Sequence, residues 1–259
     1  MKKMPRIRVS LWVTAAVIIA AILAISIFLS RDVSPSVFPV SENTVLTINT
    51  GDASVFISVE SRMDMEVIGH HTRGLQVDSS GNSITISAGG RGIVEVSVPS
   101  WIRIKSIDIS TTKGDIVVES VLAEEISLSS GSGSMMITET SSATIDGESV
   151  SGNIILTDTT SKTARLNNTA GFLRAIGTLG NIDASTESGS IYIVPIGDGV
   201  IKAETNSGNV NIIAGERSLM WETAAGSAKI YGEAMPTAGG TEDAKVTVST
   251  NTGNITIDK

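Results

Sequence analysis

The sequence contains no cysteine among its 259 residues. This excludes disulfides, thiolate metal sites, a cysteine nucleophile and a lipid-modified cysteine behind a signal sequence. Aromatic residues are also scarce, at 3%, although 41% of the residues are hydrophobic. A core of this chain must therefore consist of aliphatic side chains, which favours regular stacking over an irregular aromatic cluster.

Histidine occurs only as His70 and His71. Adjacent residues of a strand point to opposite faces, so the pair cannot readily hold one metal ion, and we expect both side chains at a solvated strand end. The nucleophile motif G-x-S-x-G is missing, and the acidic residues recur at no fixed position of the repeat described below. We therefore predict no catalytic residue, no cofactor, no metal site and a protein that is not an enzyme.

Positive charge is concentrated at the N-terminus. Removing the four basic residues Lys2, Lys3, Arg6 and Arg8 from the net charge of −8 leaves about −12 for the rest of the chain. An acidic segment without a basic, aromatic-containing patch is not expected to bind nucleic acid or an anionic lipid surface.

One long hydrophobic run follows this basic tail, from Ser10 to Ser30. It carries no charge, and as a helix it would reach roughly 30 Å, the thickness of a bilayer core. The basic residues before it place that end in the cytoplasm. We therefore predict a cytoplasmic tail over residues 1–9, a transmembrane anchor over residues 10–30 and an extracytoplasmic remainder, in a single-pass protein of the cell membrane.

A cleaved signal peptide is the alternative to this anchor. Its apolar core would usually be about 7 to 15 residues long and end in small residues at a cleavage site. After the run, two prolines make residues 31–41 a short extended linker.

A short phrase built around a glycine recurs through the second half of the chain. Successive glycines are separated by 19, 19, 19, 18, 19, 18 and 27 residues. Such a period is typical of a solenoid, in which each coil buries its apolar face only against its neighbours. These turn glycines are Gly114, Gly133, Gly152, Gly171, Gly189, Gly208, Gly226 and Gly253.

Apolar residues hold fixed positions relative to the turn glycines. The positions two and four residues after each glycine are apolar, which predicts strands with one face in the core. The inward-facing residues lie an odd number of residues before the glycine and an even number of residues after it. The chain must therefore slip by one residue at the glycine, and a glycine with positive φ permits this slip. The residues seven before the glycine are Ile107, Ile126, Ile145, Ala164, Ile182, Ile201, Leu219 and Val246.

The residue after the glycine is Asp, Ser or Asn in every coil except one, as expected for a turn. The repeat therefore predicts an all-β protein, a parallel β-solenoid (β-helix-like) with 18–19-residue coils, preceded by one N-terminal transmembrane helix. Equivalent strands should stack about 4.8 Å apart. We expect the solenoid to span residues 42–259, with irregular first coils and a cap over residues 42–105 and regular coils over residues 106–259.

Hydroxyl side chains recur three residues before the glycine, interrupted by Asn168. One interpretation is a ladder of hydroxyls that satisfies neighbouring coils. The other is a flat hydroxylated face that binds glycan or ice, which exposed aromatics such as Tyr192, Trp221 and Tyr231 would favour if they shared that face. The hydroxyl residues are Thr111, Ser130, Ser149, Thr186, Thr205, Thr223 and Thr250.

The chain closes on "TNTGNITI" at residues 250–257, an apolar strand that would leave the end of the stack open. The insertion at residues 231–244 lengthens the last interval and contains glycine, proline and acidic residues, which are poor strand formers. Either this insertion covers the end of the rod, or the end is a docking surface for self-association. We expect the insertion to be a partial cap.

The segment "VSVPSWIRIKSIDISTTKGDIVV" at residues 96–118, followed by the "SGNI" coils, resembles a known family. This is the bacterial and archaeal putative-adhesin domain of unknown function, a β-solenoid also called toastrack, found in small membrane-anchored proteins of envelope-stress operons. The resemblance covers about residues 42–259. It implies an extracytoplasmic accessory or sensory role at the cell envelope and carries no catalytic residue to this chain.

We therefore expect a non-enzymatic, membrane-anchored protein that serves as an envelope-associated interaction or stress-sensing module, with an envelope protein or a glycan as its partner. The alternative is a surface adhesin or carbohydrate-binding module. Asn167 and Asn254 lie in N-x-[ST] sequons, which matter only if the host glycosylates exterior asparagines.

Overall fold

The structure, a computed structural model, describes residues 35–259, which contain strands and no helix. The predicted tail (1–9) and anchor (10–30) lie outside the described residues. Within residues 35–259, no helix is long and apolar enough to span a membrane. The all-β class is confirmed for this part of the chain.

The strands alternate between long and short along most of the chain. They are β1 (Ser36–Phe38), β2 (Val45–Thr50), β3 (Ser54–Glu60), β4 (Met65–His70), β5 (Arg73–Ser80), β6 (Ser83–Gly89), β7 (Ile93–Pro99), β8 (Ile104–Thr111), β9 (Ile116–Glu119), β10 (Ala123–Ser130), β11 (Met135–Thr138), β12 (Ser141–Ser149), β13 (Ile154–Thr157), β14 (Thr160–Ala170), β15 (Leu173–Ser188), β16 (Ile191–Ile196), β17 (Ile201–Ser207), β18 (Val210–Ile213), β19 (Leu219–Ala225), β20 (Ala228–Ile230), β21 (Glu233–Met235), β22 (Ala238–Gly240), β23 (Val246–Thr252) and β24 (Ile255–Asp258).

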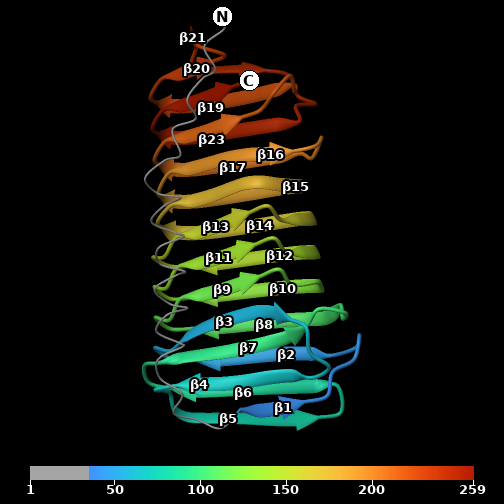
Figure 1. Ribbon diagram of the computed structural model, residues 1–259. Coiled ribbons are helices and arrows are strands. Elements are labelled where there is room, and N and C mark those ends of the chain that lie inside the picture. Colours follow the sequence, from blue (N-terminus) through green and yellow to red (C-terminus); the bar gives the residue numbers. More distant parts are fainter. Residues whose placement is uncertain (1–34) are drawn as a thin grey trace, which may run out of the picture.

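Each regular coil contributes one long and one short strand, and equivalent strands of adjacent coils pair in parallel to form a rod (Figure 1). The long-strand sheet has the order β5-β6-β2-β8-β10-β12-β14-β15-β17-β23-β19-β22. The short-strand sheet has the order β1-β4-β7-β3-β9-β11-β13-β15-β16-β18-β24-β20-β21. Strand β15 belongs to both sheets, its first residues to the short-strand sheet and its last to the long-strand sheet. The predicted parallel β-solenoid is confirmed.

The core lies between the two sheets and is aliphatic, as the composition predicts. Ile107, Ile126 and Ile145 pair in register in adjacent long strands and are at most 1% exposed. On the short strand of the same coil as Ile145, Ile154 and Leu156 are fully buried. Odd positions before the glycine and even positions after it therefore face one core, so the chain slips by one residue at the glycine.

The slip does not depend on a left-handed glycine, contrary to the expectation. Among the eight turn glycines, only Gly171 and Gly253 have a positive φ. Instead, each turn glycine lies against the backbone of the adjacent coil. A Cβ atom on Gly152 would overlap the carbonyl oxygen of Gly133, and a Cβ on Gly133 would overlap that of Gly114. Glycine is needed because adjacent coils touch at this corner.

The last coil of the chain is not the last coil of the rod. β23 lies between β17 and β19, and β24 lies between β18 and β20, so the C-terminal coil is inserted one position inside the end (Figure 1). The glycines follow this order, because Gly226 stacks on Gly253 and Gly253 stacks on Gly208. The expectation that the closing strand leaves the stack open is therefore wrong.

The insertion at residues 231–244 covers this end of the rod. Its strands β21 and β22 pair antiparallel with β20 and β19, the outermost strands of the two sheets. The insertion also contacts a core side chain, since the Trp221 Nε1 donates a hydrogen bond to the Pro236 carbonyl oxygen at 3.1 Å. The predicted partial cap is confirmed.

The N-terminal end repeats this arrangement. The coil made by β6 and β7 lies outside the coil made by β2 and β3, although it follows it in the chain. Strands β5 and β4 then pair antiparallel with β6 and β7 and cover the end. The predicted linker, residues 31–41, contains β1, which pairs with β4, because Phe38 and Val40 pack against the core.

His70 differs from the solvated residue that was expected. Its side chain is 4% exposed, and its Nε2 lies 3.0 Å from Glu95 Oε2. The antiparallel pairing of β4 with β7 places it there, because His70 is opposite Ile93, two residues from Glu95. His71 is exposed, with a left-handed φ of 54°.

Candidate functional site

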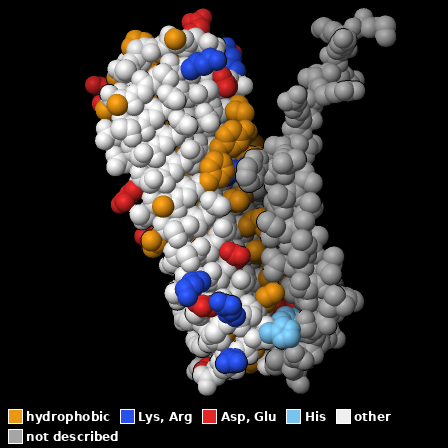
Figure 2. All heavy atoms as spheres, turned by 90° about the vertical axis from the view of Figure 1, so that its left-hand side faces the viewer, with side chains coloured by type: hydrophobic (Ala, Val, Ile, Leu, Met, Phe, Trp, Pro, Cys, Tyr) orange, Lys and Arg blue, Asp and Glu red, His pale blue; other side chains and the backbone are white. Residues whose placement is uncertain are grey.

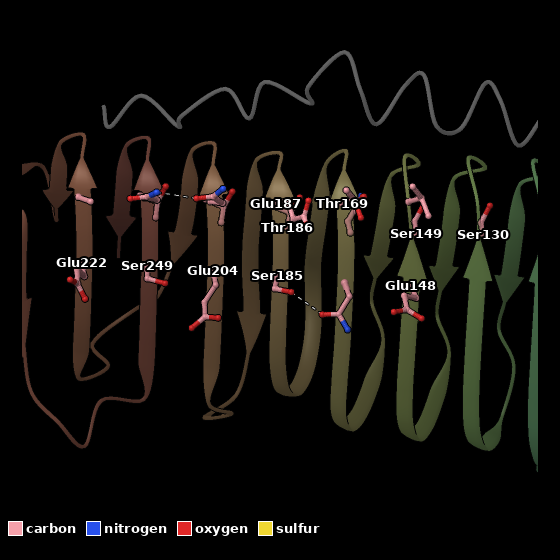
Figure 3. A pocket seen from close by; sticks show the side chains of 18 of the residues that line it. Ser130, Glu148, Ser149, Thr169, Ser185, Thr186, Glu187, Glu204, Glu222 and Ser249 are labelled. Carbon is pink, nitrogen blue, oxygen red and sulfur yellow. Dashed lines mark hydrogen bonds between the residues drawn. The ribbon is translucent and has the colours of Figure 1, made fainter.

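A concave surface of about 730 Å³ crosses the outer face of the long-strand sheet from β10 to β19 (Figure 3). We call it the polar groove. Its outward side chains come from the positions four and two residues before each turn glycine. Each coil therefore adds two side chains, except the coil of Ser129, where the second position is Gly131. They are Ser129, Glu148, Val150, Asn167, Thr169, Ser185, Glu187, Glu204, Asn206, Glu222, Ala224, Ser249 and Asn251.

The strand register aligns one of these positions into a continuous row. Glu148 pairs with Asn167, Asn167 with Ser185, and Ser185 with Glu204. The row then continues through Ser249 to Glu222. Because adjacent strands lie about 4.8 Å apart, the groove presents polar groups at a regular interval along the rod.

The groove is acidic. Four carboxylates line it, from Glu148, Glu187, Glu204 and Glu222, and among the described residues its lining includes no lysine, arginine or histidine. Lys202 lies beside it, with its Nζ 3.2 Å from Glu204 Oε1. The hydrogen bond to Glu204, with the nearby negative charges of Glu204 and Asp183, raises the pKa of Lys202. Such a surface suits a ligand that carries hydroxyl, amide or cationic groups.

Side-chain hydrogen bonds between strands orient the amides of the groove. Ser185 Oγ donates to Asn167 Oδ1 at 2.9 Å, and Asn251 Nδ2 donates to Asn206 Oδ1 at 3.1 Å (Figure 3). These contacts hold neighbouring polar groups in register. The sequon residue Asn167 therefore lies in the groove, with its side chain bonded to the next coil.

The hydroxyl column three residues before each glycine lies beneath the groove and faces inward. Each of its residues is at most 6% exposed, including Asn168. Several of the hydroxyls bond to their own glycine corner, as Ser149 Oγ does in accepting from the Gly152 N–H at 2.8 Å. Others bond to the adjacent coil: Thr111 Oγ1 donates to Ser130 Oγ at 3.1 Å, and Thr205 Oγ1 donates to the Gly189 carbonyl at 3.0 Å. The ladder interpretation is therefore correct, and a hydroxylated outer face made of this column is wrong.

In several coils, the residue after the glycine also bonds to the adjacent coil. Asp115 Oδ1 accepts a hydrogen bond from the Ser134 N–H at 2.8 Å, and Asn153 Oδ1 accepts one from the Phe172 N–H at 3.0 Å. The second sequon residue, Asn254, belongs to this series, since its Oδ1 accepts from the Ser227 N–H at 3.1 Å. These side chains stabilise the stack and are not part of the groove.

The three aromatic candidates do not line the groove. Trp221 is 8% exposed and points into the core. Tyr192 lies on β16 in the short-strand sheet, and Tyr231 follows β20 at the capped end, where its OH donates to the Gly215 carbonyl at 2.7 Å. Over residues 35–259, the structure therefore offers no aromatic platform in the lining of the polar groove.

Sequence reasoning missed the alignment of the carboxylates. Glu148, Glu204 and Glu222 share the position four residues before the glycine, a signal that was present in the repeat. This alignment was obscured because Glu187 lies two residues, and not four, before its glycine. The strands that carry Glu204 and Glu222, β17 and β19, are also separated by β23. Within the described part of the chain, no group of three or more histidine and acidic side chains is placed to hold a metal ion.

Residues 43–258 match the Toastrack DUF4097 family over nearly the whole described chain. The chain belongs to this family. Among curated proteins, none matches it significantly.

Two solved structures share the toastrack fold. One, described as a "putative adhesin" from Bacteroides fragilis, is 17% identical, with a TM-score of 0.53 and coverage of 88% of this chain and 98% of the other. A second "putative adhesin", from Parabacteroides merdae, is 11% identical, with a TM-score of 0.51 and coverage of 87% and 96%. At these identities the likeness establishes the fold alone.

Proposed function

We propose that this toastrack chain is a non-enzymatic, single-pass envelope protein whose extracytoplasmic rod engages another envelope component through the polar groove. The anchor is the uncharged run at residues 10–30, preceded by basic residues. Adhesin-like relatives of the same fold support a surface role. The envelope-stress role belongs to this proposal by analogy with the family.

The polar groove is the observation that carries this proposal. It is a concave part of the rod, it is acidic, and its polar groups repeat from coil to coil. An extended partner can follow such a surface, because equivalent groups recur about every 4.8 Å along the rod. A partner with a basic segment is the best electrostatic match.

Membrane topology tests the anchor. Protease added to intact cells stripped of any wall should digest the rod, and the protein purified from cells should retain residues 1–30 by intact mass. Full protection of the rod would contradict an extracytoplasmic location, and loss of residues 1–30 would mean that the run is a cleaved signal peptide.

A carbohydrate-binding function is the second candidate. The hydroxyl, amide and carboxylate groups of the groove favour it, whereas the lack of an aromatic side chain among the described lining residues weakens it. Soluble fragments of the host wall polysaccharide, titrated into the rod in a calorimeter, distinguish the two. Binding that is lost in the variant E204Q/E222Q supports the glycan, and no heat of binding favours a protein partner.

A further inference from the structure

The short-strand sheet carries an outward row of apolar side chains, one on each of six consecutive strands from β3 to β16. We call this row the apolar stripe. All six side chains are partly exposed, and none belongs to the core cluster or packs against it. The six residues are Phe56, Val117, Met136, Ile155, Ile176 and Val194.

The register makes the stripe continuous. Phe56 pairs with Val117, Val117 with Met136, and Met136 with Ile155. Arg174 follows Ile155 in the same row, so the stripe continues two residues further along the strands, where Ile176 pairs with Val194.

The stripe is long. Six strands at the usual spacing give about 24 Å, and Ile213 on β18, which is 37% exposed, extends the stripe to about 29 Å. A row of hydrophobic side chains also runs along the rod in Figure 2, beside a mostly uncharged polar surface. Soluble proteins rarely leave a contiguous apolar patch uncovered, so the stripe calls for an occupant.

The length and position of the N-terminal hydrophobic run match this stripe. As a helix, residues 10–30 would be roughly 30 Å long, close to the length of the stripe. The described chain enters the rod through β1, the outermost strand of the same sheet, three strands from Phe56. That distance is about 14 Å, and the five residues 31–35 can span up to about 17 Å.

We propose that the apolar stripe is an intramolecular docking site for residues 10–30, occupied while this segment is outside a bilayer and vacated when the segment inserts. Both surfaces would otherwise face water, so their mutual burial is favourable. The run carries no charge, so docking brings no charge to the stripe, and Arg174 beside the stripe has a long side chain whose guanidinium can stay in water. This inference rests on the proposed function, because it requires that the anchor is not cleaved.

Crosslinking of the full chain tests the docking, and the absence of native cysteine from the sequence makes introduced pairs unambiguous. The variant I18C/I155C places one cysteine in the middle of the run and one in the stripe. Its control, I18C/S127C, uses an exposed position on the outer face of the long-strand sheet. Both are synthesised in a cell-free system and treated with a short bismaleimide, with and without phosphatidylethanolamine–phosphatidylglycerol vesicles.

Docking predicts an intramolecular crosslink in I18C/I155C without vesicles, its loss with vesicles, and no crosslink in the control. An absent crosslink, equal crosslinking of both variants, or a crosslink that joins position 155 of one chain to position 155 of another would overturn the docking. The intact mass of the protein from cells separates the two proposals. A chain that lacks residues 1–30 contradicts the proposed function, whereas an intact chain without the crosslink contradicts the docking alone.

Discussion

At the scale of single residues, the turn glycines make the closest contacts between coils. Each one lies on the backbone of the adjacent coil, and in several coils a buried hydroxyl or amide three residues earlier bonds to this corner or to that of the adjacent coil. The corner is thus a column of backbone atoms without room for a Cβ atom. The requirement for glycine comes from this close approach and not from backbone conformation.

Replacing Gly152 by alanine should therefore destabilise the rod. The added Cβ would overlap the Gly133 carbonyl, and overpacking of this kind costs about 1–3 kcal/mol or more. Gly51→Ala is the matched control, because the nearest atom to its Cβ would be Gly90 N at 4.0 Å and its φ is not positive. Urea unfolding of both variants measures the difference, and equal midpoints would contradict the close-approach account.

The spacing of the sequence predicts where these glycines lie but not why they are needed. The contact joins residues one coil apart, so it depends on the cross-section of the coil, which no local pattern specifies. The same limit applies to His70. Its burial depends on the pairing of β4 with β7, and β4 lies outside the repeat.

At the scale of the strand, alternation decides which side chains meet the core. Adjacent residues of β13 differ sharply, because Ile154 is fully buried whereas Ile155 points outward. This alternation is readable in the sequence, and the structure confirms it in coil after coil.

Ile154→Asp should bury an unpaired carboxylate and cost several kcal/mol, roughly the penalty for burying a polar group without a partner. Ile155→Asp, one residue along the same strand, should lower the free energy of unfolding by much less. Both variants are compared in the fragment of residues 32–259, from which the hydrophobic run at residues 10–30 is omitted. Thermal denaturation of the two variants provides the comparison. Similar losses in both would refute the assignment of inward and outward positions.

The cap can be tested by removing its pairing without changing the length of the chain. Exchanging residues 233–241 for a glycine–serine segment of equal length uncovers the edges of β19 and β20, which can then recruit strands of other molecules. Sedimentation should reveal concentration-dependent association of the variant and a monomeric parent domain. A monomeric variant beside a parent that is already dimeric would identify this end as a docking surface instead.

The order of the coils could not be predicted from the sequence. Adjacent coils present nearly equivalent apolar faces and glycine corners, so the repeat alone permits the last coil to stack on either neighbour. The interval of 27 residues is the available hint, since the chain needs that length to form β21 and β22 and return.

At the scale of the whole molecule, the two ends of the rod obey the same rule. The first and last coils of the chain are each inserted inside an end, and antiparallel strands cover the coil that lies outside them. The open edges of a solenoid are thereby closed at both ends by short segments from outside the repeat. The sides of the rod remain uncovered by these segments; one outer face is acidic and polar, and the other carries the apolar stripe.

The central claim, that the polar groove meets the envelope partner, is tested most directly by photo-crosslinking in the native cell. A photoreactive amino acid is placed at Asn206 in the groove or at Asn211 on the short-strand sheet. Both positions are exposed asparagines on consecutive strands of one coil. We predict a crosslinked envelope component from position 206 and none from position 211. Equal crosslinking from both positions, or crosslinking from position 211 alone, would contradict the account.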